Sequence, residues 1–476
     1  MFRPLNLTVT TRRTAPSCAR GIELVLKCLI LVASLCVVPS VSAHQDHGQA
    51  SLRGPYPAAK QYAPTPVPDR LCLSWSSDPA TTMDVCYRTD AGVTQTLCEW
   101  AIGRDLVGNA STGGIQDAAR TQGINEPFVT NAGPCRMHTV RLQGLTPKTR
   151  YAYRVGDGVN WSPWNHFSTA SDSAEPFEFL YFGDAQNAVR SLWARVRREA
   201  HNDAPRAAFA LHAGDLINNA NADGEWGEWH EAAGWLNATI PTVATPGNHE
   251  YALAIGRRKL SKHWRPSFSL PTNGPEGLEE TCYWFDYQGT RIVSLNTNER
   301  LKEQAAWLDN TLTELPPARW TIVTFHHPVY SAAKDRDNPE VRALLKPLFD
   351  KHRIDMALQG HDHAYARSGL GGPEAAATVG THNVAQGVRG QNGRTVYVVS
   401  VSGPKMYPLT ETWDASRVAS GTQLYQTIRI ERDQLRYRAY EASGELYDAF
   451  TLQKSSPGEV LLKEEIPATP ERRRNL

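Results

Sequence analysis

Residues 177–184 read Phe-Glu-Phe-Leu-Tyr-Phe-Gly-Asp (FEFLYFGD), and residues 207–215 read AAFALHAGD. Both are short apolar runs that end in Gly-Asp. Segments with the apolar spacing of a helix follow each run, SLWARVRREA at 191–200 and GEWGEWHEAAGWLN at 224–237. Strands that alternate with helices predict an α/β domain.

The same plan continues downstream in five further apolar runs: IPTVATPGNHE (240–250), RIVSLNT (291–297), WTIVTFHHP (320–328), IDMALQGHDH (354–363) and TVYVVSVSG (395–403). Polar clusters lie just past the carboxyl ends of these predicted strands, where open α/β sheets place their ligands. We expect this domain to span residues 173–452. The charged, Pro-containing tail at 453–476 is expected to be unstructured.

A different pattern precedes the α/β domain. Four segments alternate apolar and polar residues as half-buried strands do: LCLSW (71–75), MDVCYR (83–88), HTVRLQGL (138–145) and TRYAYRVG (149–156). Turn formers separate them, so residues 69–172 are predicted to form a β-sandwich of about 100 residues. Residues 44–68, rich in Pro, Ala, Gly and Gln, predict an extended lead-in.

The N-terminus has the pattern of an export signal. Basic residues precede an apolar run from Cys28 to Val38, and Val41-Ser42-Ala43 follows as a small-x-small cleavage pattern. The alternative is a membrane anchor, but the run is shorter than the roughly 20 residues that a spanning helix needs. Residues 1–43 are therefore expected to be removed, leaving an extracytoplasmic protein, periplasmic or secreted, without stable membrane insertion.

The net charge of the chain is close to zero, so it does not attract polyanions such as nucleic acids. Lys plus Arg number 50 against 49 Asp plus Glu, and the pI is near 7.7. No nucleic-acid partner is expected, and an anionic substrate has to be held by a local site.

Five cysteines remain after the signal: Cys72, Cys86, Cys98, Cys135 and Cys282. An oxidising compartment favours pairing among the first four, for which three connectivities are possible. Cys282 is expected to be a buried small apolar residue.

Chemistry is concentrated in clusters of Asp, Asn and His at the predicted strand ends. They are Gly183-Asp184-Ala185-Gln186, Gly214-Asp215, Gly247-Asn248-His249-Glu250, Phe325-His326-His327-Pro328 and Gly360-His361-Asp362-His363. Mixed carboxylate, amide and imidazole ligands suit iron, zinc or manganese. Two such ions about 3.5–4 Å apart can clamp both oxygens of a phosphoryl displacement.

These motifs resemble the calcineurin-like metallophosphoesterases and, within them, the purple acid phosphatases. The segments RGPY (53–56), PDRLCLSW (68–75), HTVRLQGLTPKTRYAYRVGDGVNWSPW (138–164) and GHDHAYAR (360–367) carry the resemblance. It implies an α/β/β/α metallophosphoesterase sandwich behind an all-β, fibronectin-III-like sandwich. It also implies two metal ions and the hydrolysis of a phosphate ester by metal-bound hydroxide.

The resemblance further implies a role for each matching residue. Asp184, Asp215 and His363 would hold the first metal, with Asp215 bridging to the second. Asn248, His326 and His361 would complete the second metal. Catalytic roles would fall to Asp215 and to His249, which would donate to a phosphate oxygen or the departing alkoxide.

Two positions depart from the family pattern. Purple acid phosphatases have a tyrosine three residues after the bridging aspartate, where this chain has Asn218, and the wider superfamily has a histidine where this chain has Gln186. Either amide could offer a neutral oxygen to the first metal. An amide stabilises ferric iron less than a phenolate does, so a colourless enzyme with a pair of divalent ions is expected.

Roles at the site are also considered for four other polar residues. His327 could replace its neighbour His326 as a ligand, although alternation along a strand points the two to opposite faces and the resemblance favours His326. His212 could orient a ligand from the second shell. His327, Tyr365 and Arg367 are candidates for substrate binding, with a structural role as the alternative for the last two.

The expected function is an acid phosphatase-like hydrolysis of phosphomonoesters, on a small-molecule or protein substrate. The alternatives are a phosphodiesterase and a degenerate phosphatase that only binds phosphorylated ligands. Oligomeric state is left open.

Export can be tested on the mature protein. N-terminal sequencing is expected to find a start near His44. Retention of Met1 or of the apolar run would contradict cleavage.

Overall fold

The computed structural model describes residues 57–103, 108, 113–254, 256–373, 388–389, 394–410, 415–456 and 459–473. The expected export signal and the first part of the lead-in lie outside these residues. A short helix, α1 (Ala58–Gln61), precedes the first strand. Among the described helices, none combines the length and the apolar character that crossing a membrane requires.

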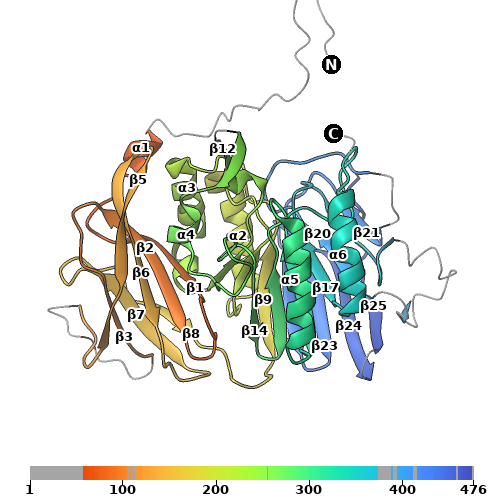
Figure 1. Cartoon of the computed structure of the whole chain (residues 1–476), viewed down its shortest axis with the longest axis horizontal. Helices are drawn as coiled ribbons and strands as arrows, with labels where there is room; N and C mark the ends of the chain where they lie inside the picture. The colour runs from red at the N-terminus through yellow and green to blue at the C-terminus, as the bar shows by residue number, and fades with distance from the viewer. Residues whose placement is uncertain are drawn as a thin grey trace, which may run out of the picture. The chain divides into compact units, whose positions relative to one another are not determined.

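The N-terminal part is a β-sandwich, as expected (Figure 1). One sheet has the order β1 (Asp69–Ser74), β2 (Met83–Asp90), β6 (Gly133–Leu142) and β5 (Ile124–Thr130). The other has the order β4 (Ala119–Gln122), β3 (Leu97–Ile102), β7 (Arg150–Gly156) and β8 (Asn165–Ser168). Inward side chains of both sheets, Tyr87 and Tyr153 among them, belong to one continuous core.

The α/β domain contains two larger sheets. The first has the order β11 (Thr242–Ala244), β10 (Ala210–His212), β9 (Phe177–Phe182), β22 (Leu424–Glu431), β23 (Gln434–Glu441), β24 (Leu446–Ser456), β25 (Glu459–Glu464) and β19 (Val388–Arg389). The second has the order β14 (Tyr283–Tyr287), β15 (Thr290–Ser294), β16 (Trp320–Phe325), β17 (Met356–Gln359), β20 (Val396–Val399), β18 (Tyr365–Arg367) and β21 (Arg417–Ala419).

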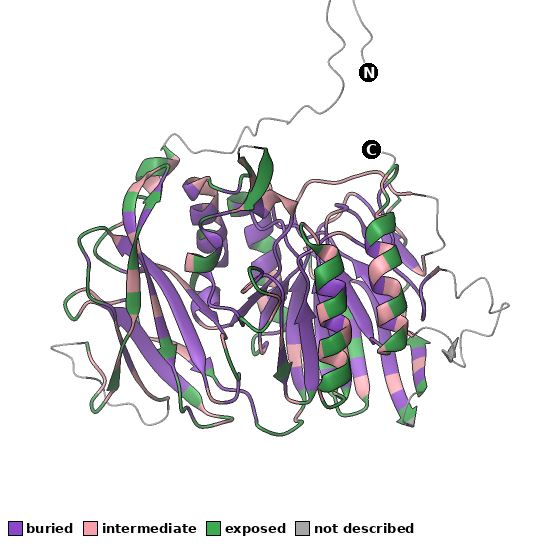
Figure 2. Ribbon diagram, in the orientation of Figure 1, coloured by how far each residue is buried: buried purple, intermediate pink, exposed green. Residues whose placement is uncertain are grey.

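Helices cover the outer faces of both sheets, which confirms the α/β/β/α plan. Residues such as Phe179 on β9 and Ile322 on β16 share one core between the sheets. The outer face of the first sheet is covered by η1 (Val189–Trp193), α2 (Ala194–Asp203) and α3 (Asp223–Ala233). On the second sheet, α5 (Leu301–Glu314) and α6 (Pro339–Lys351) pack through residues such as Leu308 and Phe349. Figure 2 shows their buried inner and exposed outer faces.

Parallel pairing brings the polar clusters to one edge. β9, β10 and β11 run parallel in the first sheet, and β15, β16, β17 and β20 run parallel in the second. The carboxyl ends of parallel strands lie at the same edge of a sheet, and here the ends of both sheets meet. The remaining short segments are η2 (Gly234–Ala238), η3 (Asn248–Glu250), α4 (Trp264–Ser267), and the hairpin of β12 (Tyr251–Ala254) and β13 (Arg257–Leu260).

A buried ion-pair cluster joins the β-sandwich to α3. Asp223 is the first residue of the helix. Its Oδ1 lies 2.8 Å from Nη1 of Arg70, and its Oδ2 lies 3.2 Å from Nη1 of Arg88. The carboxylate is fully buried and both guanidinium groups are nearly so. Burying three charged groups carries a large desolvation penalty, which is offset only because each group has a partner of opposite charge.

The C-terminal tail differs from its prediction. Residues 453–476 were expected to be unstructured, but β24 extends to Ser456 and β25 pairs with it in antiparallel register. Val460 and Leu462 of β25 are buried. Charged residues obscured the alternation, because only one face of this antiparallel strand is buried and only that face needs to be apolar.

The expected cysteine pairing is also wrong: all five cysteines of the described chain are free. Cys72 and Cys86 are cross-strand partners on β1 and β2, but Cys98 lies in the other sheet of the sandwich. Burial raises the pKa of the Cys72 thiol to about 12 and that of Cys135 to about 11. These residues therefore act as small apolar side chains, the role expected for Cys282 alone.

The ion-pair cluster at Asp223 makes a prediction about stability. Asp223→Ala leaves two buried guanidinium groups short of a partner and should lower the free energy of unfolding by about 3–5 kcal/mol. Lys148→Ala, which breaks an exposed ion pair with Glu175, should cost less than about 1 kcal/mol. Denaturant unfolding measures both. Equal effects of the two substitutions would contradict the account.

Candidate metal centre

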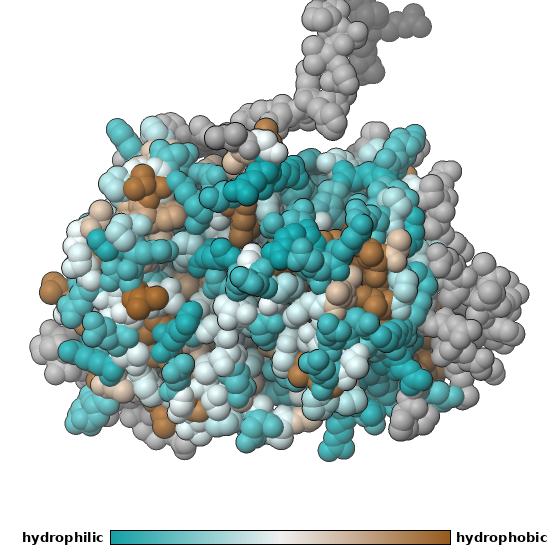
Figure 3. Space-filling view, viewed as in Figure 1, coloured by the Kyte–Doolittle hydropathy of each residue, from teal (hydrophilic) through white to brown (hydrophobic). Residues whose placement is uncertain are grey.

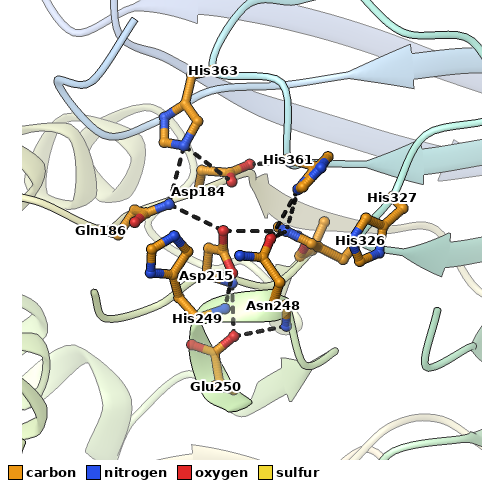
Figure 4. A network of polar contacts seen from close by, with 12 residues as sticks. Asp184, Gln186, Asp215, Asn248, His249, Glu250, His326, His327, His361 and His363 are labelled. Carbon is orange, nitrogen blue, oxygen red and sulfur yellow. Dashed lines mark hydrogen bonds and ion pairs between the residues drawn. The ribbon is translucent and has the colours of Figure 1, made fainter. Parts of the chain in front are cut away.

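The predicted metal ligands converge at the carboxyl edge of the two sheets (Figure 4). Asp184 follows β9 and Asp215 follows β10, while Asn248 begins η3 just after β11. His326 follows β16, and the loop after β17 contains His361 and His363. Segments far apart in sequence thus place side chains of one chemical class around a common centre.

Tight loops make this convergence possible. A Cβ on Gly247 would lie 2.1 Å from Oδ1 of Asp215, and a Cβ on Gly360 would lie 2.5 Å from Oδ2 of Asp184. Only glycine fits at such approaches. Asp184, Asp215, His361 and His363 themselves have positive φ angles of 22°, 52°, 76° and 46°. Non-glycine residues in this region carry backbone strain, which clusters at functional sites.

The ligand atoms form two groups that share one residue. In the first group, ligand atoms of Asp184, Asp215 and His363 all lie within 4.8 Å of one another. The second group consists of Asp215, His326 and His361 under the same limit. Nε2 of His326 is 3.2 Å from Oδ2 of Asp215. Asp215 is therefore placed to serve two ions.

Asn248 joins the second group through its amide oxygen. Oδ1 lies 3.0 Å from Nε2 of His326 and 2.9 Å from Nδ1 of His361, and these two nitrogens are 3.1 Å apart. An oxygen and two imidazole nitrogens at such separations form one face of a coordination shell.

Buried charge dominates the electrostatics. Burial raises the pKa of Asp184 well above its usual range, with His326 opposing this shift and Asp215 adding to it. Burial acts in the same direction on Asp215, but the charges of His326 and His249 hold its pKa well below the usual range. Burial alone would lower the pKa of His326, yet the neighbouring Asp215 and Asp184 raise it to about 9.

Burial keeps the other two histidines of these groups neutral. Burial lowers the pKa of His363 to about 3 and that of His361 well below its usual range. Backbone carbonyls orient two of the rings, because Nδ1 of His326 lies 2.9 Å from the oxygen of Ala213 and Nδ1 of His363 lies 3.1 Å from that of Lys405. The rings of His326 and His363 therefore donate Nδ1–H outward, which leaves their Nε2 atoms to face the centre.

These residues fit a pair of metal ions. Oδ1 of Asp184 is buried and has no hydrogen-bond partner in the described part of the chain, and it lies 3.7 Å from Nε2 of His363. An unpartnered buried carboxylate oxygen is costly, and a cation between it and the imidazole would satisfy both atoms. The mixed oxygen and nitrogen donors suit zinc, manganese or iron.

Glu250 is a functional residue that the sequence did not single out. Its buried carboxylate accepts backbone N–H bonds from Asp215 at 2.8 Å, Leu216 at 2.8 Å and Gly247 at 2.7 Å. Burial, reinforced by the charge of Asp215, raises its pKa to about 7. It fixes the Asp215 loop against the Asn248 loop. Its place within the Gly-Asn-His-Glu motif was the available signal.

Arg336 was missed as well, since nothing in its local sequence marks it. Its guanidinium hydrogen-bonds to Nε2 of His361, the ring nitrogen that faces away from Asn248. Nε of Arg336 lies 3.1 Å from the buried carboxylate of Asp362, and the group stacks 5.3 Å from the centroid of Tyr407. A partly exposed cation thus lies at the rim of the centre.

The two amides differ in position. Nε2 of Gln186 lies 3.0 Å from both Oδ2 of Asp215 and Nε2 of His363, within the first ligand group. The side chain of Asn218 instead accepts a bond from Asn187 at 3.2 Å, and its backbone oxygen lies 2.6 Å from Nδ1 of His249. Gln186 is the amide that faces the centre.

Two other histidines stand apart from the ligand groups. His327 points to Thr297, with 2.9 Å between its Nδ1 and Oγ1, and its ring packs 4.3 Å from that of His361. The expected ligand-orienting role of His212 is wrong. Its ring is buried 5.2 Å from Phe182, and neither nitrogen has a hydrogen-bond partner in the described chain.

Of the two roles considered for Tyr365 and Arg367, the structure supports a structural role and contradicts substrate contact. Both side chains are buried and point to the first sheet, where Asp448 accepts the hydroxyl at 2.6 Å and Nε of Arg367 at 2.7 Å. Glu464 on β25 pairs with the same guanidinium at 2.7 Å. These residues join the two sheets, and alternation along β18 turns them away from the metal centre.

Family models cover both parts of the chain. Residues 68–169 match the model described as "Purple acid Phosphatase, N-terminal domain". Residues 177–365, which contain the predicted metal ligands, match "Calcineurin-like phosphoesterase".

Curated relatives agree with these matches. Acid phosphatase type 7 of Homo sapiens is 27% identical over 341 residues, which cover 64% of this chain and 72% of that protein. Purple acid phosphatase 15 of Arabidopsis thaliana is 26% identical over 267 residues, which cover 49% of each chain.

A solved structure shows the same fold. The purple acid phosphatase PPD1 from yellow lupin seeds superposes with a TM-score of 0.66 at 19% identity, covering 82% of this chain and 75% of that one. The chain belongs to the calcineurin-like phosphoesterases, as a purple acid phosphatase-like member, and is a metal-dependent phosphatase or phosphoesterase.

Proposed function

We propose that this protein is an exported acid phosphatase-like enzyme that hydrolyses phosphate monoesters at a pair of metal ions. The first ion would be held by Asp184, Asp215 and His363, and the second by Asp215, Asn248, His326 and His361. One observation carries the proposal: the ligand atoms form two groups with a single common carboxylate, Asp215. A binding protein that had lost catalysis would have no need to keep both groups intact.

When bound, two such ions would polarise a phosphoryl oxygen and lower the pKa of a coordinated water. The buried carboxylates and imidazoles would hold them in a largely buried region, where charge stabilisation of the transition state is strongest. Arg336 lies beside His361 and can bind a phosphate oxygen from the rim, since a guanidinium donates in a planar fork that suits phosphate.

His249 is placed to act on the substrate without binding metal. Its backbone N–H donates to Oδ1 of Asp215 at 2.8 Å, and Nδ1 donates to the backbone oxygen of Asn218 at 2.6 Å. These two bonds fix the ring beside the centre (Figure 4). Nε2 has no hydrogen-bond partner among the residues that the structure describes. It can therefore donate to a phosphate oxygen or to the departing oxygen.

Gln186 is the proposed neutral ligand of the first ion. Its amide lies between Asp215 and His363, and its Oε1 is buried without a hydrogen-bond partner in the described regions. Rotation of the amide by 180° would turn this oxygen to the centre and the nitrogen away. Without a phenolate, the site would favour divalent zinc, manganese or iron.

We also propose that the enzyme works outside the cytoplasm, periplasmic or secreted, after cleavage at Ala43. The basic start, the apolar run and the small-x-small pattern support this location.

The role of His249 predicts a loss of turnover without loss of metal. His249→Ala should reduce kcat on an activated aryl phosphate by about 10²–10⁴-fold, the usual contribution of general acid–base catalysis. Metal content should equal that of the wild type. His166→Ala, the same change on the distant strand β8, is the control and should retain full turnover. Turnover within threefold of wild type in His249→Ala would remove this residue from the mechanism.

The role of Gln186 predicts a change in metal content. Gln186→Leu should lower the zinc bound per chain from about two ions towards one, measured by mass spectrometry of the metals after dialysis against limiting zinc. Asn218→Leu should retain both ions, because that side chain bonds to Asn187. Iron-loaded wild type should show no visible charge-transfer band. The reverse result for the two variants, or a strong band, would contradict this ligand assignment.

A further inference from the structure

The hairpin of β12 and β13 grows directly out of the proposed catalytic motif. β12 begins at Tyr251, the residue after Glu250, and Tyr251 pairs with Leu260 of β13. The backbone N–H of Ser261 donates to the oxygen of Glu250 at 2.7 Å, which closes the base of the hairpin. The two strands pair only with each other among the described strands. The base of the hairpin is thus attached to the metal centre.

β13 presents three adjacent cations: Arg257, Arg258 and Lys259. All three are exposed, and none has a carboxylate partner within the described residues. By contrast, nearby Arg265 lies 3.5 Å from both Glu279 and Glu280. Adjacent like charges repel one another, so an arrangement without compensation favours an anionic ligand.

These cations line a cavity of about 430 Å³. Lys262 and Arg265 extend the basic lining, and Gly277 and Thr281 form part of the far wall. The single acidic residue in the lining is Glu299, which already accepts the hydroxyl of Tyr251 at 2.5 Å. The volume lies within the range of small-molecule sites, roughly 300–1,000 Å³.

Register places the cavity within reach of the metal centre. Arg258 is opposite Leu253, four residues beyond His249, so at most about 13 Å of extended strand separate the two positions. Arg258 shares its face of the hairpin with Tyr251, whose hydroxyl accepts a bond from Asn296 at 2.6 Å.

The hairpin is open to solvent. Figure 1 labels the hairpin at β12, and Figure 2 colours most of it as exposed. In Figure 3, strongly hydrophilic residues cover the same part of the surface. A ligand in the cavity would therefore not need to displace an apolar surface.

We propose that Arg257, Arg258 and Lys259 bind a second phosphate group of the substrate, so that the preferred substrates are phosphate esters that carry at least two phosphates. The inference rests on the proposed hydrolysis at the metal centre and adds the substrate class. One phosphate would lie at the ions while another, separated by at most about 13 Å of strand, is held by guanidinium and ammonium groups. The gain in binding energy applies only to multiply phosphorylated compounds.

A matched pair of substrates tests the proposal in the full-length, metal-loaded enzyme. Fructose 1,6-bisphosphate and fructose 6-phosphate differ by one phosphate group, and phosphate release gives kcat/KM for each. The ratio of the two values should exceed ten in the wild type. The triple variant Arg257→Gln, Arg258→Gln, Lys259→Gln should lower this ratio at least tenfold, and Arg258→Gln should have the largest single effect.

The control variant carries the same change of charge at three exposed residues outside the cavity: Arg150→Gln, Arg198→Gln and Arg206→Gln. Its ratio should stay within twofold of the wild type. Salt gives a second measurement that needs no variant. Raising ionic strength from 0.05 to 0.5 M shortens the screening length to about 4 Å and should reduce the bisphosphate preference of the wild type.

Each opposing result has a separate meaning. A wild-type ratio near one, a ratio unchanged in the hairpin variant, or an equal fall in the control variant would overturn the second-phosphate site. If the wild type hydrolyses neither sugar phosphate nor an aryl phosphate with zinc, manganese or iron, the proposed hydrolysis itself fails.

Discussion

The carboxylate of Asp215 is the constraint on which the rest of the site depends. It is fully buried, it belongs to both ligand groups, and a negative charge in such a place needs cations around it. Its backbone is held by Glu250, whose carboxylate accepts the N–H groups of Asp215 and Gly247. The same loop geometry requires Gly247, since a side chain there would overlap Oδ1 of Asp215. Chemistry and backbone packing are thus coupled at one residue.

The fold supplies what this carboxylate needs. Parallel strands from two sheets bring aspartates from one side and histidines from the other, because loops after parallel strands emerge at a common edge. Behind that edge, Arg367 on β18 pairs with Asp448 on β24 and Glu464 on β25, a buried cluster that ties the second sheet to the first. Such a pair fixes the relative position of the sheets, and with it the distance between aspartates and histidines.

The sequence was informative where function depends on local pattern. The clusters that contain Asp184, Asp215 and His363 could be placed because each follows an apolar strand, and the same runs predicted an α/β domain. The α/β/β/α plan and the roles of the ligands came from the family resemblance. The sequence was uninformative where partners are distant in the chain. Substrate binding and a structural role stayed open for Tyr365 and Arg367, since only the tertiary structure shows Asp448 behind them. Arg336 and the strand β25 were missed for the same reason, and Cys98 lies in a different sheet from the cysteines expected to pair with it.

The central claim is that one carboxylate serves two ions, and anomalous X-ray diffraction from crystals grown with zinc tests it most directly. Data collected above and below the zinc edge should show two peaks about 3.5–4 Å apart, one on each side of Asp215, as in other two-metal sites. A single peak at Asp215, or peaks that leave His326 and His361 without a neighbour, would contradict the account.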